Sequence, residues 1–500
     1  MDANETADVV VVGGGTAGAV LAARLSEDPS RRVLLLEAGV AYAPDEFPAV
    51  LTDEARIGGD ADHDWGYTAR GGRLSPKIMA LRGKALGGSS AINGAVAVRA
   101  RPADFERWNL PGWSFADVLP VYRALENAPD GEARFHGRSG PFPIRWRERE
   151  DLSPSGLAFI DACVHQGFPL ITDFNAEVAG GVGQLPVNVV DHVRQNTALV
   201  YLTAEVRARP NLRIRGGTLA DRVLLESGAA TGVVTSDGTV YRAPRVVLSA
   251  GSYGSAAVLL RSGVGPAADL AGLGVDVVAD LPVGRHLQDH PFFYNVYALA
   301  PEHTRMAPGP LAQLWAATGE AGPGELDLHI NAQHLLDPSI SPTGGTIVLA
   351  VGLVQPESRG TLRLSSTNPA DPPLIDNNFL ATDRDRRRMI EVVRLARRIA
   401  GNAVLSPFLA TEMMPGATVT DADLPQAVES ALESYGHPVA TAPMGLAGDE
   451  RAVVDPQGAV YGVDGLHVAD ASIMPLTPSA ATNLTTIMIA ERIAAQLRRS

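Results

Sequence analysis

The sequence has a single cysteine, Cys163, among its 500 residues. One cysteine cannot form an internal disulfide bond or a cysteine-based zinc cluster. The sequence also lacks the H-E-x-x-H pattern of zinc proteases, the aspartate-rich loop that binds calcium and the G-x-S-x-G turn of serine hydrolases. We therefore expect neither a metal site nor a serine nucleophile.

Positive charge is also scarce. The 42 Lys and Arg residues are outnumbered by 56 Asp and Glu residues, which leaves a formal net charge of −14. Nucleic-acid binding needs a basic surface that displaces counterions from the phosphates, so this composition argues against nucleic acid as a partner. The sequence does not indicate the oligomeric state.

A long apolar run and a basic leader are missing as well. Residues 346–354 form one of the longest apolar runs, which is far shorter than the roughly 20 residues needed to cross a bilayer. Residues 1–7 include acidic side chains and no basic one, so the charged start of a secretory signal is absent. We expect a cytoplasmic protein without a transmembrane segment.

What is present is an α/β pattern, in a chain long enough for two or three folding units. Short apolar, β-branched runs predict buried strands of a parallel sheet, and segments rich in small or periodically apolar residues predict helices between them. The predicted strands are 8–12, 33–36, 245–248 and 466–469, and the predicted helices are 17–25, 255–261 and 483–497.

The glycine-rich turn after the first predicted strand indicates a dinucleotide site. Residues 13–18 satisfy G-x-G-x-x-G between a buried strand and a helix. Gly13 permits the tight turn, Gly15 lets the backbone approach a pyrophosphate, and Gly18 lets the helix pack closely on the strand. Glu37 ends the second strand, where a carboxylate accepts ribose hydroxyls and repels a 2′-phosphate. The pattern favours NAD or FAD over NADP as the cofactor. The alternative interpretation of these residues is a glycine-rich turn beside a glutamate on the surface.

A second glycine- and serine-rich loop covers residues 82–93 and carries two fixed cations, Arg82 and Lys84. Its composition suits contact with a phosphate and with the edge of an isoalloxazine ring. On chemistry alone it would serve equally well as a solvated loop.

This loop and three further segments resemble signatures of the glucose-methanol-choline (GMC) oxidoreductase family. The first family signature resembles residues 82–99, and the second resembles residues 251–265. The loop 283–290 and the stretch 465–475 match the family in type and order. In length and spacing the chain is most similar to bacterial primary-alcohol and hydroxymethylfurfural-type oxidases and to choline-type dehydrogenases.

The resemblance implies FAD as the cofactor and an α/β fold, α+β overall. A doubly wound, Rossmann-like FAD-binding domain would be interleaved with a substrate domain built on a large, mostly antiparallel sheet flanked by helices. The FAD-binding domain is assigned to 1–145, 195–292 and 432–500, and the substrate-binding domain to 146–194 and 293–431.

The resemblance also implies a catalytic pair, His437 and Asn483. Hydride transfer from a carbinol carbon to flavin N5 is uphill while the hydroxyl keeps its proton, so a base must take that proton. A histidine is neutral yet basic near pH 7, which suits His437 to this task. Asn483 would orient the hydroxyl by a hydrogen bond. The expected substrate is a small-molecule alcohol, and O2 or another acceptor takes the electrons.

The residues expected to bind FAD lie in the glycine turn, at the end of the second strand, in the two signatures and around the start of the last helix. The positive N-terminal end of that helix would face the flavin. Asp470 is a candidate for the ribityl hydroxyls and Asn93 for the flavin edge or a phosphate, and both are alternatively loop-capping residues. The full set is Gly13, Gly15, Thr16, Ala17, Gly18, Glu37, Ala38, Arg82, Gly83, Leu86, Gly87, Gly88, Ser89, Asn93, Gly94, Ala95, Val96, Ala250, Gly251, Asp470, Ala471, Asn483, Leu484 and Thr485.

The chain departs from the family pattern at several positions. Some members tether FAD through a histidine at the position of Ile92, so we expect non-covalent FAD here. Ala256 replaces a usual proline, Ala481 replaces the first Asn of an Asn-Thr-Asn run, and the pair 442–443 stands where Cys-Arg is frequent. The changes near the site alter the polarity of the pocket and leave the substrate open.

Other residues are expected to play supporting roles. His286 and His290 lie on a loop that we expect to be a structural part of the cofactor domain. The substrate pocket is expected to be lined from the second domain, by His329, Asn331 and the run 346–354.

Two other functions remain open from the sequence. One is a flavoprotein of the same fold without net redox chemistry, either a hydroxynitrile lyase or a light-driven decarboxylase. A lyase would also use a histidine at the flavin, whereas the His–Asn pair argues against the decarboxylase. The other is a protein that only holds FAD. Anaerobic bleaching of the yellow chromophore by alcohols separates alcohol oxidation from both.

Overall fold

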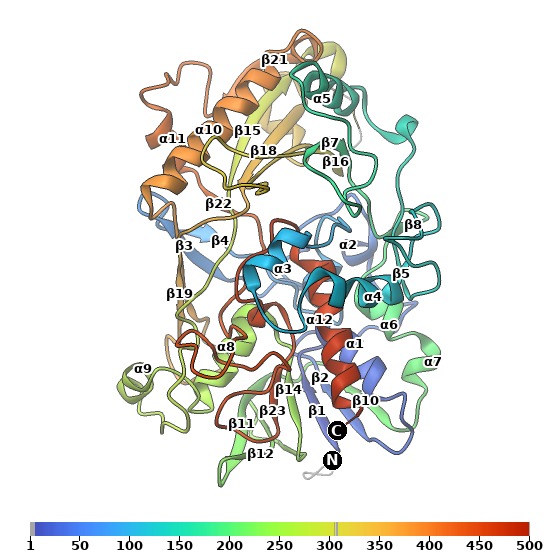
Figure 1. Ribbon diagram of the computed structural model, residues 1–500, viewed down its shortest axis with the longest axis vertical. Coiled ribbons are helices and arrows are strands. Elements are labelled where there is room, and N and C mark those ends of the chain that lie inside the picture. The colour runs from blue at the N-terminus through green and yellow to red at the C-terminus, as the bar shows by residue number, and fades with distance from the viewer. Residues whose placement is uncertain (1–5, 305, 307–308, 500) are drawn as a thin grey trace.

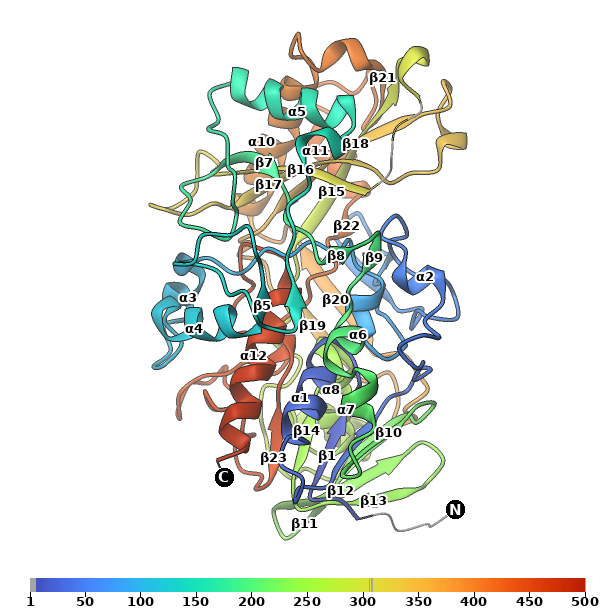
Figure 2. The same cartoon turned by 90° about the vertical axis from the view of Figure 1, so that its right-hand side faces the viewer.

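The computed structural model describes residues 6–304, 306 and 309–499, and it shows two main layers of sheet and helix (Figure 1). A parallel sheet with helices occupies the lower part of the view, together with both chain termini, and a larger antiparallel sheet with helices occupies the upper part. Figure 2 shows the same two parts from the side.

The lower sheet is parallel throughout and has the order β10-β2-β1-β14-β23. Every residue of β1, β2 and β14 is buried, as expected for short β-branched runs covered on both faces. The four predicted strands are confirmed. The sheet consists of β1 (Val9–Val12), β2 (Val33–Leu36), β10 (Leu212–Arg215), β14 (Val246–Leu248) and β23 (Leu466–Val468).

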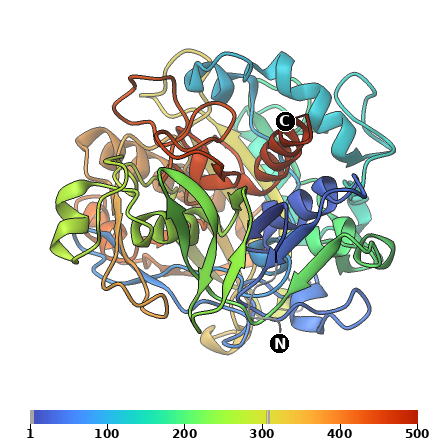
Figure 3. The ribbon, with the colours of Figure 1, turned by 90° about the horizontal axis from the view of Figure 1, so that it is seen from below.

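Three helices follow strands of this sheet: α1 (Thr16–Leu25), α8 (Gly251–Arg261) and α12 (Thr482–Leu497). The view from below shows α1 and α12 side by side (Figure 3). All three predicted helices are confirmed, although α8 begins at Gly251 instead of Ser255. A distant carboxylate explains the earlier start, because Asp470 accepts hydrogen bonds from the Gly251 backbone N–H and the Ser255 hydroxyl.

The upper sheet is antiparallel, with the order β21-β15-β18-β17-β16-β7 and β22 paired to β15. Helices α5 (Pro154–His165) and α10 (Asp383–Ala400) pack against it. The strands are β7 (Gly181–Gln184), β15 (Pro291–Leu299), β16 (Gly309–Ala316), β17 (Leu328–His334), β18 (Thr346–Leu353), β21 (Leu409–Met414) and β22 (Glu433–Ser434).

A four-stranded sheet connects segments from the two predicted domains. It joins β3 (Thr68–Gly72) and β4 (Ile78–Met79) to β19 (Thr361–Arg363) and β20 (Leu374–Phe379), with β3 and β20 parallel. Backbone hydrogen bonds therefore connect the two parts of the chain. The exact domain boundaries remain a prediction.

The remaining elements are short or peripheral. The strands are β5 (Glu126–Asn127), β6 (Phe142–Pro143), β8 (Val189–Val190), β9 (Val193–Arg194), β11 (Ala220–Glu226), β12 (Ala229–Thr235) and β13 (Val240–Arg242). The helices are α2 (Ala49–Thr52), α3 (Pro102–Trp108), α4 (Phe115–Leu125), α6 (Thr197–Tyr201), α7 (Ala204–Arg207), α9 (Ala267–Gly272) and α11 (Leu424–Ser430). Within the described ranges, no helix has both the length and the apolar character that crossing a membrane requires.

Candidate active site

A cavity of about 440 Å³ lies between the parallel and antiparallel sheets. One end is lined by Gly13 and Glu37, at the carboxyl ends of β1 and β2. The other end is lined by His329 and Asn331 on β17. A crevice at the carboxyl ends of parallel strands is the usual ligand site of open α/β sheets.

The glycine turn forms a cradle at the first end. Gly13 has φ +94°, and a Cβ there would lie 2.6 Å from the Ala250 Cα atom, so only glycine fits. A Cβ on Gly18 would lie 1.8 Å from the Gly13 carbonyl oxygen, which confirms the close packing predicted for Gly18. At Gly15 a Cβ would meet only Gly88, no nearer than 3.6 Å, so Gly15 borders open space at the N-terminus of α1. A phosphate fits this space, where free backbone N–H groups and the helix dipole favour an anion.

Glu37 lies in the same cradle and is almost fully buried. Its carboxylate accepts backbone hydrogen bonds from Gly14 and Gly39, both at 2.7 Å. Burial raises the pKa of Glu37 to about 7, against the lowering effect of those two bonds. Each carboxylate oxygen keeps a second lone pair, so the group can still accept a ribose hydroxyl.

Most of the predicted FAD-binding residues line the cavity, including Thr16, Arg82 and Ser89. A smaller group supports the lining from behind. Leu86 packs under Gly14, for example, and the Thr485 hydroxyl bonds to the Tyr122 hydroxyl at 2.9 Å. The predicted residues outside the lining are Gly18, Leu86, Gly87, Ala95, Leu484 and Thr485.

Asp470 and Asn93 line the cavity and also hold the chain locally. The Asp470 carboxylate accepts four hydrogen bonds, from Gly251, Ser255 and both the backbone N–H and hydroxyl of Ser472. It therefore caps α8 and the turn at 471–473, which is the alternative role considered for it. The Asn93 side-chain oxygen accepts from the Ala95 backbone N–H at 2.9 Å, which is likewise a turn contact.

His437 and Asn483 line the same cavity although they come from different elements. His437 lies on the loop after β22, and Asn483 lies in the first turn of α12. The Asn483 carbonyl oxygen accepts from the Thr16 hydroxyl at 3.3 Å. Its amide nitrogen is buried and has no hydrogen-bond partner in the part of the chain that the structure describes. A buried donor of this kind is free to bind an oxygen atom of a ligand.

His290 fixes the proton arrangement of His437. The Nδ1 atoms of the two rings are 3.0 Å apart, and His290 Nε2 lies 3.0 Å from the Pro478 carbonyl oxygen. A carbonyl only accepts, so His290 Nε2 carries the hydrogen, and the neutral ring accepts at Nδ1. His437 must then donate from Nδ1, which leaves its Nε2 unprotonated on the opposite side of the ring.

Burial keeps both rings neutral near pH 7. It lowers the pKa of His290 to about 4. It also holds the pKa of His437 well below 6.5, and repulsion from His290, Arg82 and His329 acts in the same direction. The free Nε2 of His437 is therefore available as a proton acceptor.

Asp289 holds both histidines in place. One of its oxygens accepts the backbone N–H groups of His437 and His290, at 2.8 and 2.7 Å, and the other accepts the Ser434 hydroxyl. His286 and His290 were both expected to be structural, but the structure separates them, because of the two only His290 contacts His437. The Gln-Asp-His order at the end of the 283–290 loop was the signal in the sequence that could have indicated this role of His290. It does not indicate which of these side chains faces the site.

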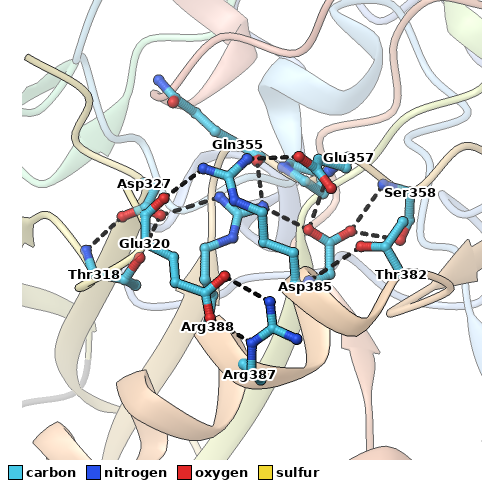
Figure 4. A network of polar contacts seen from close by, with 12 residues as sticks. Thr318, Glu320, Asp327, Gln355, Glu357, Ser358, Thr382, Asp385, Arg387 and Arg388 are labelled. Atoms are coloured by element: carbon cyan, nitrogen blue, oxygen red, sulfur yellow. Dashed lines mark hydrogen bonds and ion pairs between the residues drawn. The ribbon is translucent and has the colours of Figure 1, made fainter. Parts of the chain in front are cut away.

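Figure 4 shows a polar network around Arg388 that is connected to this loop through a hydrogen bond of Gln288. Arg388 of α10 bridges Asp327, Asp385 and the Gln355 carbonyl oxygen. Asp385 in turn accepts from the backbone and hydroxyl of Ser358. The segment 355–358, which this network holds, contacts the loop 283–290, because Gln288 donates a hydrogen bond to the Pro356 carbonyl oxygen at 3.0 Å. The arrangement ties the position of His290 to the N-terminal turn of α10.

The residues predicted to line the substrate pocket differ in their relation to the cavity. His329 and Asn331 line the cavity, whereas the run 346–354 does not, so that expectation was wrong. The run forms the central strand β18, and its cavity-side residues Ala350 and Gly352 are small. Tyr435 covers Gly352, where a Cβ would lie 3.2 Å from the tyrosine ring. Among the described residues, no group of three or more His, Cys, Asp or Glu side chains is arranged to hold a metal ion.

Comparison with known proteins identifies the family. Models described as GMC oxidoreductase match residues 7–292 and 356–490. An uncharacterized GMC-type oxidoreductase of Rhodococcus erythropolis is 37% identical over 505 residues, with 98% of each chain covered. Human mitochondrial choline dehydrogenase is 35% identical over 535 residues, covering 97% of this chain and 88% of the relative.

Solved structures agree. Pyridoxine 4-oxidase from Mesorbium loti superposes with a TM-score of 0.91 at 31% identity, covering 99% of both chains. A formate oxidase of Aspergillus oryzae, studied for modification of its FAD, shares the fold with a TM-score of 0.87 at 24% identity, covering 99% of this chain and 98% of that one. These comparisons confirm the predicted fold class and FAD as the cofactor. The chain belongs to the GMC oxidoreductase family, whose members and structural neighbours are FAD-binding flavoproteins and include oxidases and dehydrogenases of alcohols.

Proposed function

We propose that this enzyme oxidises a small primary alcohol to the carbonyl compound, with His437 as the base and Asn483 orienting the hydroxyl. The observation that carries the proposal is the pairing of His437 with His290, which leaves an unprotonated nitrogen on a ring that lines the same cavity as the free amide donor of Asn483. An alcohol oxygen placed between them would donate to His437 Nε2 and accept from Asn483 Nδ2.

The residues around the cavity suit FAD. The cradle at Gly15 and Gly88 would take the pyrophosphate, and Glu37 the ribose hydroxyls. The N-terminal turn of α12 places a positive helix end at the cavity, where it favours negative charge. Ile92 lines the cavity and offers no atom for a covalent tether, which supports non-covalent binding.

When bound, FAD would supply the hydride acceptor. The chain supplies the rest: His437 Nε2 takes the hydroxyl proton, and the ring becomes an imidazolium. Its Nδ1–H continues to donate to neutral His290, and this bond strengthens when the donor is charged. Asn483 keeps the oxygen in place while the C–O bond becomes a carbonyl.

Relatives that oxidise choline or pyridoxine support a small alcohol as the substrate. Either O2 or another acceptor would reoxidise the cofactor, and the relatives include an oxidase as well as dehydrogenases. The cytoplasmic location stays a prediction from the sequence.

Anaerobic mixing with a panel of alcohols tests the proposal. We expect at least one alcohol to bleach the yellow chromophore of the wild-type enzyme. His437→Ala should keep the colour and lose the bleaching, because the cofactor remains bound without a base. His286→Ala on the neighbouring loop serves as the control and should bleach normally. Turnover in His437→Ala at the wild-type rate, or cyanohydrin cleavage without bleaching, would contradict the assignment.

A further inference from the structure

The roof of the cavity has a regular arrangement of side chains. Residues paired across neighbouring strands lie on the same face of a sheet. His329 is paired through Gly352 to Phe292, and Asn331 is paired through Ala350 to Tyr294. All four large side chains line the cavity, so one face of the sheet carries polar groups at β17 and aromatic groups at β15.

The two polar side chains on β17, His329 and Asn331, are buried and carry polar atoms that lack a hydrogen-bond partner within the described residues. His329 is 2% exposed and Asn331 is 1% exposed. Neither ring nitrogen of His329 has a hydrogen-bond partner within the described residues, and the same holds for the Asn331 carbonyl oxygen. The Ser479 backbone carbonyl acts to raise the pKa of His329, although it forms no hydrogen bond of normal geometry with the ring. Buried polar atoms are nearly always paired, so these atoms mark a place for ligand atoms.

The orphaned atoms are close to the reacting end. The His329 and Tyr435 ring centres are 6.1 Å apart, and those of Tyr435 and His437 are 4.5 Å apart. Asn331 donates its amide hydrogen to the Tyr435 hydroxyl, so its carbonyl oxygen remains as an acceptor. Tyr435 therefore contacts the proposed base and both polar groups, so His329 and Asn331 are one aromatic side chain away from His437.

The chemistry of these groups selects a neutral ligand. Burial holds the pKa of His329 well below 6.5, so the ring is neutral, with one donor and one acceptor nitrogen. The free oxygen of Asn331 requires a donor from the ligand. A carboxylate would attract a fixed cation, and Glu433, a cavity-lining carboxylate on β22, pairs with Phe292. It thus lies three strands from His329, roughly 14 Å at a strand spacing of about 4.8 Å.

We propose that His329 and Asn331 determine substrate specificity and select an aromatic primary alcohol whose ring carries a neutral hydrogen-bond donor, such as a hydroxyl group. This assignment rests on the proposed alcohol oxidation. The apolar part of such a ring would pack against Phe292, Tyr294 and Tyr435, and its donor would reach Asn331 or His329.

Anaerobic flavin reduction by matched alcohols tests the assignment. The panel is benzyl alcohol, 3- and 4-hydroxybenzyl alcohol, 4-methoxybenzyl alcohol, pyridoxine and choline. We expect a hydroxylated ring to exceed benzyl alcohol and 4-methoxybenzyl alcohol in kcat/KM by about tenfold, the value of one or two buried hydrogen bonds. Reduction by benzyl alcohol alone would preserve the proposed function and overturn this inference.

Variants locate the effect. Asn331→Leu and His329→Phe should each reduce the preference for the hydroxylated ring about tenfold, chiefly through KM. Asn377→Leu is the matched control, because the Asn377 amide is also buried and unpartnered in the described structure but lies outside the cavity. An unchanged preference in the first two variants, with normal FAD content and melting temperature, would overturn the inference. Preference for choline, lost in Glu433→Gln, would overturn it as well.

Discussion

Replacement of His290 tests the proton arrangement at the site. His290→Phe keeps an aromatic ring of similar size and removes both nitrogens, so His437 loses the acceptor for its Nδ1–H. In wild type this hydrogen bond holds the correct tautomer and becomes charge-assisted when His437 takes the proton. A hydrogen bond to a charged group contributes about 1.5–3 kcal/mol. The rate of flavin reduction should therefore fall by about 10- to 150-fold.

The assay is anaerobic stopped-flow bleaching at saturating alcohol. KM should change little, because His290 does not line the cavity. His290→Asn separates positioning from folding, since an Asn oxygen near the position of Nδ1 again offers an acceptor and should restore part of the rate. Melting temperature and FAD content report the loss of the contacts to Thr477 and Pro478. A His290→Phe enzyme that reduces its flavin within twofold of the wild-type rate would show that His290 does not set the protonation of His437.

Three further predictions follow from the site. The apoprotein of Gly15→Ala should have an unchanged melting temperature but bind FAD more weakly. Gly13→Ala should lose both stability and FAD, because its Cβ would clash with Ala250. Equal behaviour of the two variants in thermal melts and FAD titrations would contradict the role of Gly15 in the phosphate cradle. The pKa of His437 is held below 6.5, so the active neutral form of the ring persists as the pH falls through 6.5. The rate of flavin bleaching should therefore decline only at lower pH. A half-maximal rate at or above pH 6.5 would contradict this prediction. Acid denaturation followed by filtration should release all of the yellow chromophore, and colour retained with the protein would disprove non-covalent FAD.

Much of the fold was predictable because its signals are local. The buried strands at 9–12 and 33–36 and the glycine turn between strand and helix depend on short β-branched runs and on a backbone conformation that only glycine adopts. The start of α8 was misplaced because its cap, Asp470, comes from a distant segment. The lining role of 346–354 was wrong for a related reason: an apolar run predicts burial, but not whether a neighbour such as Tyr435 covers it.

Local sequence patterns were enough to predict the family, the glycine turn, and a histidine and an asparagine that line the cavity. The sequence did not reveal that His290 contacts His437, that Asp289 holds both, or that His329 and Asn331 have unsatisfied polar atoms. The physical reason is that periodicity and turn chemistry act over a few residues. Hydrogen-bond partners and unsatisfied polar atoms arise from segments that meet only after the whole chain has packed.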